Sequence, residues 1–480
     1  MENFELGLWV FLSIIIGCFS YFYFKNKTKN QIHNHLPKGN LGWPFLGESL
    51  DFIASAYTSQ PVSFMDKRIS LYGKVFKSHI LGTPIIVSTD AEVNKVVLRN
   101  HGNLFIPAYP KSVRELFGEF SILQMNGILQ KKLHSLIAGF LRSPLLKSTI
   151  TKDIQNSVIY TLASWKNIKP LLIQQETKKI TFRVLVKALM GIGPGDDLDF
   201  FEREFEVFIK GLICLPIKLP GTTLYKSLKA KERMMKRVRK IVEERKLAME
   251  KNIDNIVAND AIDVLLRDHM EENQKQPLSL DLITGNIIEM MIPGEETVPT
   301  AMTLAVKFLS DCSVALNQIT EENMELKRKK SDDYKWSDYM SLTFTQNVIN
   351  ETLRLANIIN GVWRKALKDV QIKGHLIPEG WCVLASFTSI HMDNQVYENP
   401  YQFDPWRWEK GSVNNNNNFT PFGGGQRLCP GLELSKLEIS IFLHHLLTTY
   451  RWEAEKDEIV YFPTVKMRKK LPITVTTFNT

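Results

Sequence analysis

Residues 422–431, with the sequence FGGGQRLCPG, combine a single cysteine, Cys429, with an arginine and several glycines. The glycines allow the backbone to approach a flat group closely, and nearby N–H groups can donate hydrogen bonds to a sulfur atom. A thiolate at Cys429 could therefore ligate the iron of a haem, with Arg427 neutralising one of its carboxylates. The alternative is a buried free cysteine in a glycine-rich turn. The clustered glycines, Arg427 and the flanking Phe422 favour the haem ligand.

A second group of residues interrupts a helical pattern that covers residues 281–311, at the sequence PGEETVP. Prolines inside a helix cost about 3 kcal/mol and free carbonyl groups, while Gly294 lacks a side chain. We therefore expect the helix to open here and to make room for a small ligand. Glu296 and Thr297 beside the opening are residue types that deliver protons to bound dioxygen. The alternative is a kinked core helix in which Thr297 bonds back to its own turn.

A third group contains Glu351 and Arg354, which share one face of a predicted helix because they are three residues apart. Such a pair is usually an ion pair on the surface. A further arginine, Arg407, lies in the sequence DPWRW shortly before the cysteine segment. One carboxylate that bridges both arginines could lock the cysteine segment in place.

The elements that must position these groups are mostly helices, because apolar residues return every three to four positions in several long stretches. These stretches are residues 153–165, 200–211, 226–250 and 281–311.

Strand-like runs are fewer and predict two hairpins. Residues 75–80 and 84–88 would pair around Gly82, and residues 370–377 and 381–385 would pair around Gly380. The sequence thus predicts a mainly α fold with a small β portion. An asparagine-rich run at residues 414–418 is expected to be a surface loop.

The N-terminus carries an uncharged run of 19 residues, 6–24. This is close to the ~20 residues that a helix needs to cross a bilayer. Glutamates precede the run and lysines follow it, which predicts a retained anchor, residues 1–24, with its N-terminus in the lumen and the remaining chain in the cytosol. A cleaved signal peptide is the alternative, but it has the opposite charge order. Residues 25–47 are rich in proline and glycine and are expected to form a stiff hinge.

The remaining residues, 48–480, contain no internal repeat and no linker, so we expect one large domain. The net charge of +9 is spread over stretches such as residues 226–246, where acids alternate with bases. This pattern is typical of a solvated helix face and does not support nucleic-acid binding. The five cysteines are scattered without a C-x-x-C pair, which argues against disulfides and structural zinc.

Taken in this order, the motifs resemble those of the cytochrome P-450 family over the whole chain. The resemblance implies a cytochrome P-450 fold and a haem b whose iron is bound by Cys429. It also implies insertion of one oxygen atom of O2, with electrons from NADPH delivered by a membrane-bound NADPH-cytochrome P-450 reductase. For a chain with this anchor, the resemblance implies the endoplasmic reticulum membrane, with the catalytic domain in the cytosol. Its cysteine motif matches Phe422, Gly425, Arg427, Cys429 and Gly431, and its structural triad matches Glu351, Arg354 and Arg407.

The resemblance assigns haem propionate partners with some departures. Arg364 matches a propionate arginine, and His134 matches the basic end of a W-x-x-x-R pattern. Gln130 stands where the family usually has tryptophan or histidine, so one propionate hydrogen bond is expected to be weaker or to be made by Lys131 instead. In the central helix, Pro293 and Val298 replace a small residue and a second hydroxyl, which leaves more of the proton relay to Thr297.

A finer resemblance points to plant steroid oxidases. Residues 109–118, 212–222 and 290–297 are similar to those of brassinosteroid-biosynthetic hydroxylases, above all those that act on C-23 of the sterol side chain. The apolar stretch 212–222 suits a loop that dips into the membrane surface where a sterol would enter, although a packed loop is an alternative. The resemblance also places seven apolar side chains in the substrate pocket, each of which could instead be ordinary core: Phe120, Ile122, Met125, Met291, Ile292, Ile359 and Val362.

Other functions compete with C-23 hydroxylation. One is hydroxylation of another plant steroid or triterpenoid, for example at C-22. Another is a haem-thiolate isomerase that needs neither reductase nor dioxygen, but such proteins commonly lack the acid-threonine pair that Glu296 and Thr297 form. A last alternative is a membrane protein that keeps the fold as a binding module, which the intact cysteine motif argues against.

Overall fold

The computed structural model describes residues 36–478 except 59, 168–169, 252–257, 272–275, 331–333 and 410–417. The predicted anchor and most of the asparagine-rich run lie outside the described residues. Among the helices that are described, none is long and apolar enough to cross a membrane. Residues 36–47, the described part of the predicted hinge, contain no helix and are tied to the domain by a bridge between Gly39 and Lys77.

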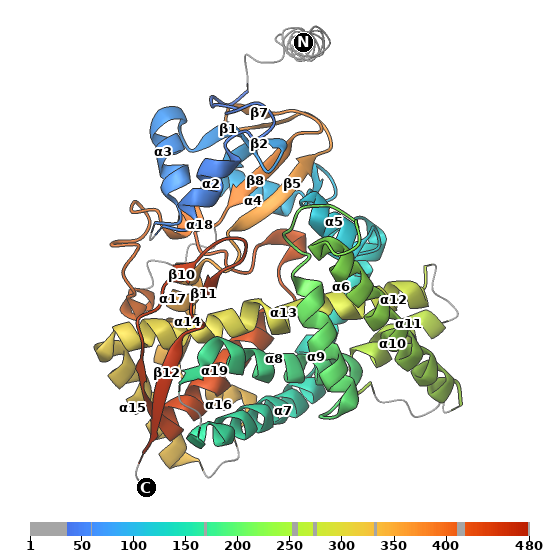
Figure 1. Ribbon diagram of the computed structural model, residues 1–480, viewed down its shortest axis with the longest axis vertical. Helices are drawn as coiled ribbons and strands as arrows, with labels where there is room; N and C mark the ends of the chain where they lie inside the picture. Colours follow the sequence, from blue (N-terminus) through green and yellow to red (C-terminus); the bar gives the residue numbers. More distant parts are fainter. Residues whose placement is uncertain are drawn as a thin grey trace, which may run out of the picture.

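Helices make up most of the lower part of the molecule in Figure 1, and the main sheet lies above them near the N-terminal end. The prediction of a mainly α fold with a small β portion is confirmed. The α-helices are α2 (Ser49–Ser55), α3 (Ser63–Tyr72), α4 (Ala91–Arg99), α5 (Lys111–Phe117), α6 (Ile128–Arg142), α7 (Pro144–Ala163), α8 (Ile173–Met190), α9 (Asp196–Ile209), α10 (Thr223–Lys251), α11 (Ala261–Met270), α12 (Leu280–Met290), α13 (Ile292–Glu295), α14 (Thr297–Asp311), α15 (Ser313–Lys329), α16 (Trp336–Met340), α17 (Thr343–Ala356), α18 (Thr388–His391) and α19 (Leu432–Thr449). Three 3-10 turns are η2 (Ser164–Asn167), η4 (Pro405–Trp408) and η5 (Gly425–Arg427).

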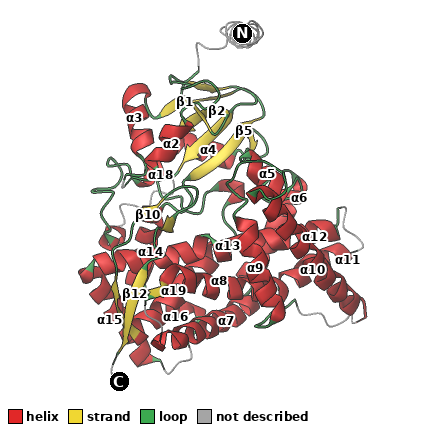
Figure 2. Ribbon diagram, viewed as in Figure 1, coloured by secondary structure: helices red, strands yellow, loops and turns green. Residues whose placement is uncertain are grey.

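The strands form one five-stranded sheet with the order β1-β2-β8-β5-β3 and three smaller sheets (Figure 2). The strands are β1 (Val75–Ile80), β2 (Thr83–Ser88), β3 (Phe105–Pro107), β4 (Leu171–Leu172), β5 (Gly361–Ala366), β6 (Val370–Ile372), β7 (His375–Ile377), β8 (Cys382–Ser386), β9 (Tyr450–Ala454), β10 (Ile459–Val460), β11 (Lys466–Met467) and β12 (Pro472–Thr477).

One of the two predicted hairpins is confirmed, and the other is wrong. β1 and β2 pair antiparallel around Leu81 and Gly82. The run 370–377, however, folds on itself, because Lys373 and Gly374 both have positive φ and turn β6 directly into β7. β8 instead pairs antiparallel with β5 and parallel with β2, and all of its residues are buried, as expected for a central strand.

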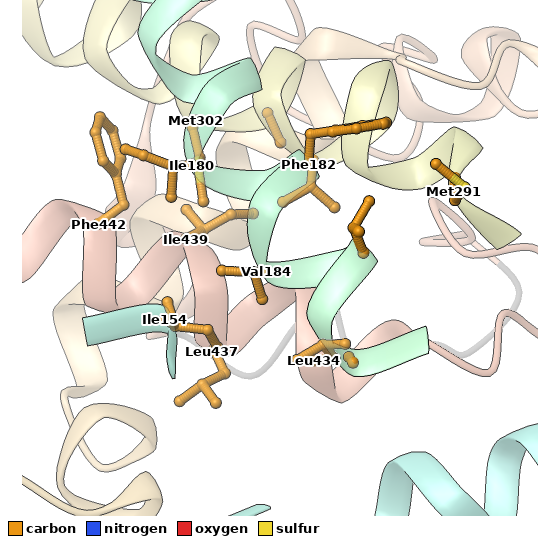
Figure 3. Packing of buried hydrophobic residues seen from close by; sticks show 14 of the residues in the cluster. Ile154, Ile180, Phe182, Val184, Met291, Met302, Leu434, Leu437, Ile439 and Phe442 are labelled. Atoms are coloured by element: carbon orange, nitrogen blue, oxygen red, sulfur yellow. The ribbon is translucent and has the colours of Figure 1, made fainter. Parts of the chain in front are cut away.

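The helical core is built where α7, α8, α14 and α19 meet. Figure 3 shows Ile154 of α7, Ile180 of α8, Met302 of α14, and Leu437 and Phe442 of α19 packed together, all with no accessible surface. Burying an apolar side chain of this size contributes about 1.5–3 kcal/mol. The same packing fixes the position of α19, which starts directly after the cysteine segment.

The stretch 281–311 is not one continuous helix but the succession α12, α13 and α14, as the prolines predict. Two carbonyl groups near the break, one on α13 and one on α14, accept hydrogen bonds from threonines of α8. Thr181 donates to the carbonyl of Gly294 at 2.5 Å, and Thr177 donates to the carbonyl of Pro299 at 3.2 Å. The break is therefore stabilised from the neighbouring helix.

Gly294 packs closely against the neighbouring helix α8. A Cβ atom at this position would lie 3.0 Å from Leu185 and 3.1 Å from the carbonyl of Thr181, both on α8. The missing side chain permits the close contact of α13 with α8. That the opened helix makes room for a ligand stays a prediction.

We predict that Thr181→Val lowers the free energy of unfolding by about 1–3 kcal/mol, because the buried carbonyl of Gly294 loses its side-chain donor. Urea titration followed by circular dichroism measures this. Thr448→Val is the matched control, since its hydroxyl bonds only a carbonyl of its own helix, that of His444. Equal losses in the two variants would contradict the pinning of the break by α8.

Candidate active site

The cysteine segment is a closed loop that rests on α4. The N–H of Cys429 donates to the carbonyl of Phe422 at 3.1 Å. Gly425 has a φ of 65°, and a Cβ atom there would lie 2.4 Å from the carbonyl oxygen of Leu98. Only glycine can occupy this position without moving the loop from α4.

Cys429 itself is partly accessible and stands immediately before α19. Burial raises the pKa of its thiol, and a hydrogen bond from the backbone of Gly431 lowers it. The positive N-terminal end of α19 also favours a negative sulfur. The position therefore combines a poorly solvated thiol, which stays protonated on its own, with groups that stabilise a thiolate once a metal binds.

Arg427 uses all five N–H donors of its guanidinium on protein acceptors. Its Nε donates to Nε2 of His101 at 2.8 Å, and Nη1 donates to the carbonyls of Ile122 and Leu123 at 3.0 and 3.1 Å. Nη2 donates to the carbonyl of Met125 and to the side chain of Asn126. Burial lowers the pKa of Arg427 to about 10, so the group remains charged at neutral pH. Arg427 thus fastens residues 122–126 to the cysteine segment.

Positive charge collects beside this contact. Burial, together with the charges of Arg427, Arg364 and Lys131, lowers the pKa of His101 to about 3. Arg364, on β5, is buried, donates from Nη1 to the carbonyl of Trp363 at 3.0 Å, and has no partner for its Nε among the described residues. No carboxylate is among the groups that shift the pKa of His101 or Arg427. An acidic group of a ligand would therefore balance the positive charge of this cluster.

The two other predicted propionate partners lie on α6. The ring of His134 contacts the carbonyl of Leu428 through Nε2 at 2.9 Å, so His134 bears on the cysteine segment itself. Lys131 is exposed and acts on the cluster through its charge. Gln130 is buried, and its Oε1 has no hydrogen-bond partner in the described part of the chain.

Glu351, Arg354 and Arg407 meet in the interior. Glu351 bonds Arg354 with both oxygens at 2.8 and 2.9 Å and accepts from Nε of Arg407 at 3.0 Å. The side chains of Glu351 and Arg354 are fully buried, so the pair is not the surface ion pair of the alternative interpretation. The backbone N–H of Asp404 and the indole of Trp408 also donate to Glu351, at 3.1 Å each.

Residues that the motifs did not indicate connect this triad to the cysteine segment. The carbonyl of His391 accepts a hydrogen bond from Arg354 at 2.7 Å. The ring of His391 accepts a second one, through Nε2, from the N–H of Thr420 at 3.1 Å. Tyr397 donates to the carbonyl of Asn418 at 3.0 Å, and the rings of Trp408 and Phe419 lie 4.5 Å apart. The sequence shows aromatic and histidine residues at positions 391–408, but their spacing does not predict which residue each of them contacts.

The acid-threonine pair lies at the break of the central helix. Glu296 ends α13 and lies 3.8 Å from Nζ of Lys178, which bonds Glu295 at 2.6 Å. Burial raises the pKa of Glu295, and Lys178 opposes this. Thr297 donates to the carbonyl of Pro293 at a long 3.4 Å, so the bond of the alternative interpretation exists but is weak. Lys178 on α8 was not indicated by the sequence.

The side chains assigned to the substrate pocket do not share one environment. Met291 has no accessible surface and packs in the helical core, which favours the ordinary-core interpretation for this residue (Figure 3). Phe120 and Ile359 are 72% and 45% exposed. Four are partly buried: Ile122, Met125, Ile292 and Val362.

Comparison with known proteins identifies the family. Residues 37–475 match the family model described as Cytochrome P450. The chain belongs to the cytochrome P450 family. It is 67% identical to 3-epi-6-deoxocathasterone 23-monooxygenase CYP90C1 of Arabidopsis thaliana over 92% of this chain and 85% of that one. A second Arabidopsis thaliana protein with the same activity in its name, CYP90D1, is 53% identical over 91% of this chain and 89% of the other.

More distant P450s extend the comparison. Cholesterol 22-hydroxylase CYP90B27 of Paris polyphylla is 36% identical over 97% of each chain. The solved structure of a retinoic acid-bound cyanobacterial CYP120A1 has a TM-score of 0.81 and 25% identity, and covers 92% of this chain and 99% of its own. The haem that the family implies fits the site, because Cys429 is partly accessible and, among the described residues, no carboxylate shifts the pKa of His101 in the neighbouring positive cluster.

We predict that Glu351→Gln destabilises the fold by about 3–5 kcal/mol, because it leaves two buried arginines without their carboxylate. Chemical denaturation measures the loss, and the haem content of the purified variant should fall with it. Glu325→Gln, which removes an exposed pair with Lys329, is the control and should leave stability essentially unchanged. A Glu351→Gln variant as stable as this control would refute the locking role of the triad.

Proposed function

We propose that this P450 hydroxylates C-23 in the side chain of a plant steroid, as a step of brassinosteroid biosynthesis, with O2 as oxidant and with electrons from NADPH. The observation that carries the proposal is the 67% identity to a 3-epi-6-deoxocathasterone 23-monooxygenase over 92% of the chain. The substrate of this class is a largely apolar steroid, and its recognition depends on which carbon is held next to the reacting centre.

Residues from several elements of the site would together hold the haem. Cys429 would bind the haem iron, and the backbone of Gly431 donates a hydrogen bond to its sulfur. Phe422 and Gly425 shape the loop around it, and His134 contacts that loop from α6. Arg364 and Lys131 would balance the charge of the propionates. When bound, the haem supplies the activation of O2 that no side chain can provide.

Proton delivery is assigned to the break in the central helix. Thr297 makes one weak hydrogen bond there, so its hydroxyl can turn toward another acceptor. Glu296 is partly exposed, and its carboxylate lies near the ammonium group of Lys178. This opposite charge stabilises the ionised form of Glu296.

The setting we propose is the endoplasmic reticulum membrane, with residues 6–24 as a single span, the catalytic domain in the cytosol and an NADPH-cytochrome P-450 reductase as electron donor. Exposed apolar side chains support a membrane surface next to the domain. Trp43 and Phe45 are 79% and 78% exposed, and Leu215 and Leu219 are 75% and 65% exposed. The latter pair belongs to the stretch 212–222, which we propose as the part that meets the membrane where the sterol enters.

The direct test supplies the membrane-bound protein with reductase, NADPH and a 22-hydroxylated campestanol-type sterol. We expect one new hydroxyl, located at C-23 by mass spectrometry and NMR of the product. An unhydroxylated sterol offered in parallel should be a poorer substrate. Hydroxylation at C-22 of that sterol would replace the proposal by the alternative regioselectivity, and turnover without NADPH would favour a haem-thiolate isomerase.

We predict that Thr297→Ala retains haem but consumes about 10–100-fold more NADPH per product formed, because proton delivery is disturbed and electrons are diverted to hydrogen peroxide. NADPH oxidation, peroxide and product are measured together. Thr297→Ser restores the hydroxyl and should return the ratio close to that of the native protein. An unchanged ratio in Thr297→Ala would remove Thr297 from the proton path.

A further inference from the structure

Residues 120–125 connect the two parts of the candidate site. In the cysteine segment, Arg427 donates to the carbonyls of three of these residues. The helix α12, which leads into the break of the central helix, bonds residues 120–122 through the side chains of Asn286 and Glu289. The segment is therefore attached to both elements that carry the proposed chemistry.

Asn286 commits its whole amide group. Its Oδ1 accepts from the N–H of Ile122 at 2.8 Å, and its Nδ2 donates to the carbonyl of Phe120 at 3.1 Å. Nδ2 also donates to the carbonyl of Leu282, in the same helix, at 2.8 Å. The side chain is 1% exposed, so water does not compete for these bonds. Only one orientation of the amide satisfies an N–H and two carbonyls at once.

The backbone of Ile122 is held at both of its polar groups. Its N–H is bonded by Asn286 from α12, and its carbonyl accepts from Nη1 of Arg427 at 3.0 Å. The side chain of Ile122 is only partly buried, so part of its apolar surface remains free for contact with a ligand. Two hydrogen bonds from different elements thus set the place of Ile122 relative to Cys429.

Two further polar side chains support the same region. Ser121 donates to Glu289 at 2.5 Å, and its hydroxyl accepts from the N–H of Leu123 at 3.1 Å. Lys231 of α10 donates to the carbonyls of the last two residues of α5, at 2.9 and 2.7 Å. Asn286 differs from both, because it bonds a backbone N–H and a backbone carbonyl within the segment itself.

We propose that Asn286 is a positioning residue for the hydroxylation: it holds residues 120–122 at a fixed place relative to Cys429, and thereby fixes which carbon of the steroid side chain is presented for reaction. A displacement of about 1 Å in a residue that positions a substrate is enough to change the outcome of a reaction. Asn286 acts through the segment that it holds. The inference rests on the proposed function.

Three variants separate this role from a general loss of stability. Asn286→Leu keeps the approximate size of the side chain and removes both bonds to the segment. Asn323→Leu is the matched control, because Asn323 on α15 is just as buried and also donates to the carbonyl four residues earlier in its helix, at 2.8 Å. Ser121→Ala loosens the same segment without changing α12, so it decides the case if Asn286→Leu yields no folded protein.

The first measurement is hydrogen–deuterium exchange of the full-length haem protein without sterol. We expect the peptide that contains Ile122 to exchange about 10-fold faster in Asn286→Leu, because its N–H loses its acceptor. Ser121→Ala should show a smaller change in the same direction, and Asn323→Leu should exchange there like the native protein. Native exchange in this peptide of Asn286→Leu would overturn the inference.

The second measurement is titration with the 22-hydroxylated campestanol-type sterol, followed by product analysis. We expect Asn286→Leu to bind the sterol about 10-fold more weakly and to form products hydroxylated at other side-chain carbons beside C-23, with the carbon monoxide spectrum unchanged. Native affinity with C-23 as the single product would contradict the positioning role. A native protein that forms no C-23 product would overturn the proposed function, while the exchange comparison would still decide whether Asn286 holds the segment.

Discussion

Glu351 is a carboxylate without accessible surface on which five donors converge, from Arg354, Arg407, Asp404 and Trp408. Such a charge is tolerable only because both arginines and the additional N–H groups replace water around it. The geometry of residues 391–408 depends on this contact, since the arginines also bond the carbonyls of His391, Glu398 and Pro400. His391 in turn holds Thr420 at the entrance of the cysteine segment. The position of Cys429 is thus set from the interior by one buried charge.

The opposite side of the site depends on a different device. The central helix is broken by prolines, and threonines of α8 bond the carbonyls of Gly294 and Pro299 on the two sides of the break. α8 is itself packed in the core with α7, α14 and α19, so the break cannot slide along the helix. α19 begins directly after the cysteine segment, and α14 begins at Thr297. The same core therefore positions both Cys429 and Thr297. Residues 122–126, fastened by Arg427, join the two sides.

Much of this arrangement follows from the sequence. The prolines at positions 293 and 299 predict the break because proline cannot donate a helical hydrogen bond, and the helical repeat predicts α7, α9 and α10. The partners across the fold could not be predicted, since they depend on packing between distant elements. Lys178 beside Glu296, His101 beside Arg427 and Leu185 against Gly294 are of this kind. The prediction of the second hairpin was wrong for a local reason. Lys373 adopts a positive φ, which cannot be predicted from its residue type. Arg427 shows a further limit: its motif indicates a haem partner, but it does not indicate the contacts of its guanidinium with His101 and residues 122–126.

The central claim is that this chain holds haem through the thiolate of Cys429. The most direct test is the absorption spectrum of the reduced, carbon monoxide-bound protein in membranes, recorded for the native chain and for Cys429→Ala. The account predicts the red-shifted Soret band of a thiolate ligand in the native protein and its absence in the variant, because alanine cannot bind iron. A native protein without the band, or a Cys429→Ala variant that keeps it, would contradict the assignment.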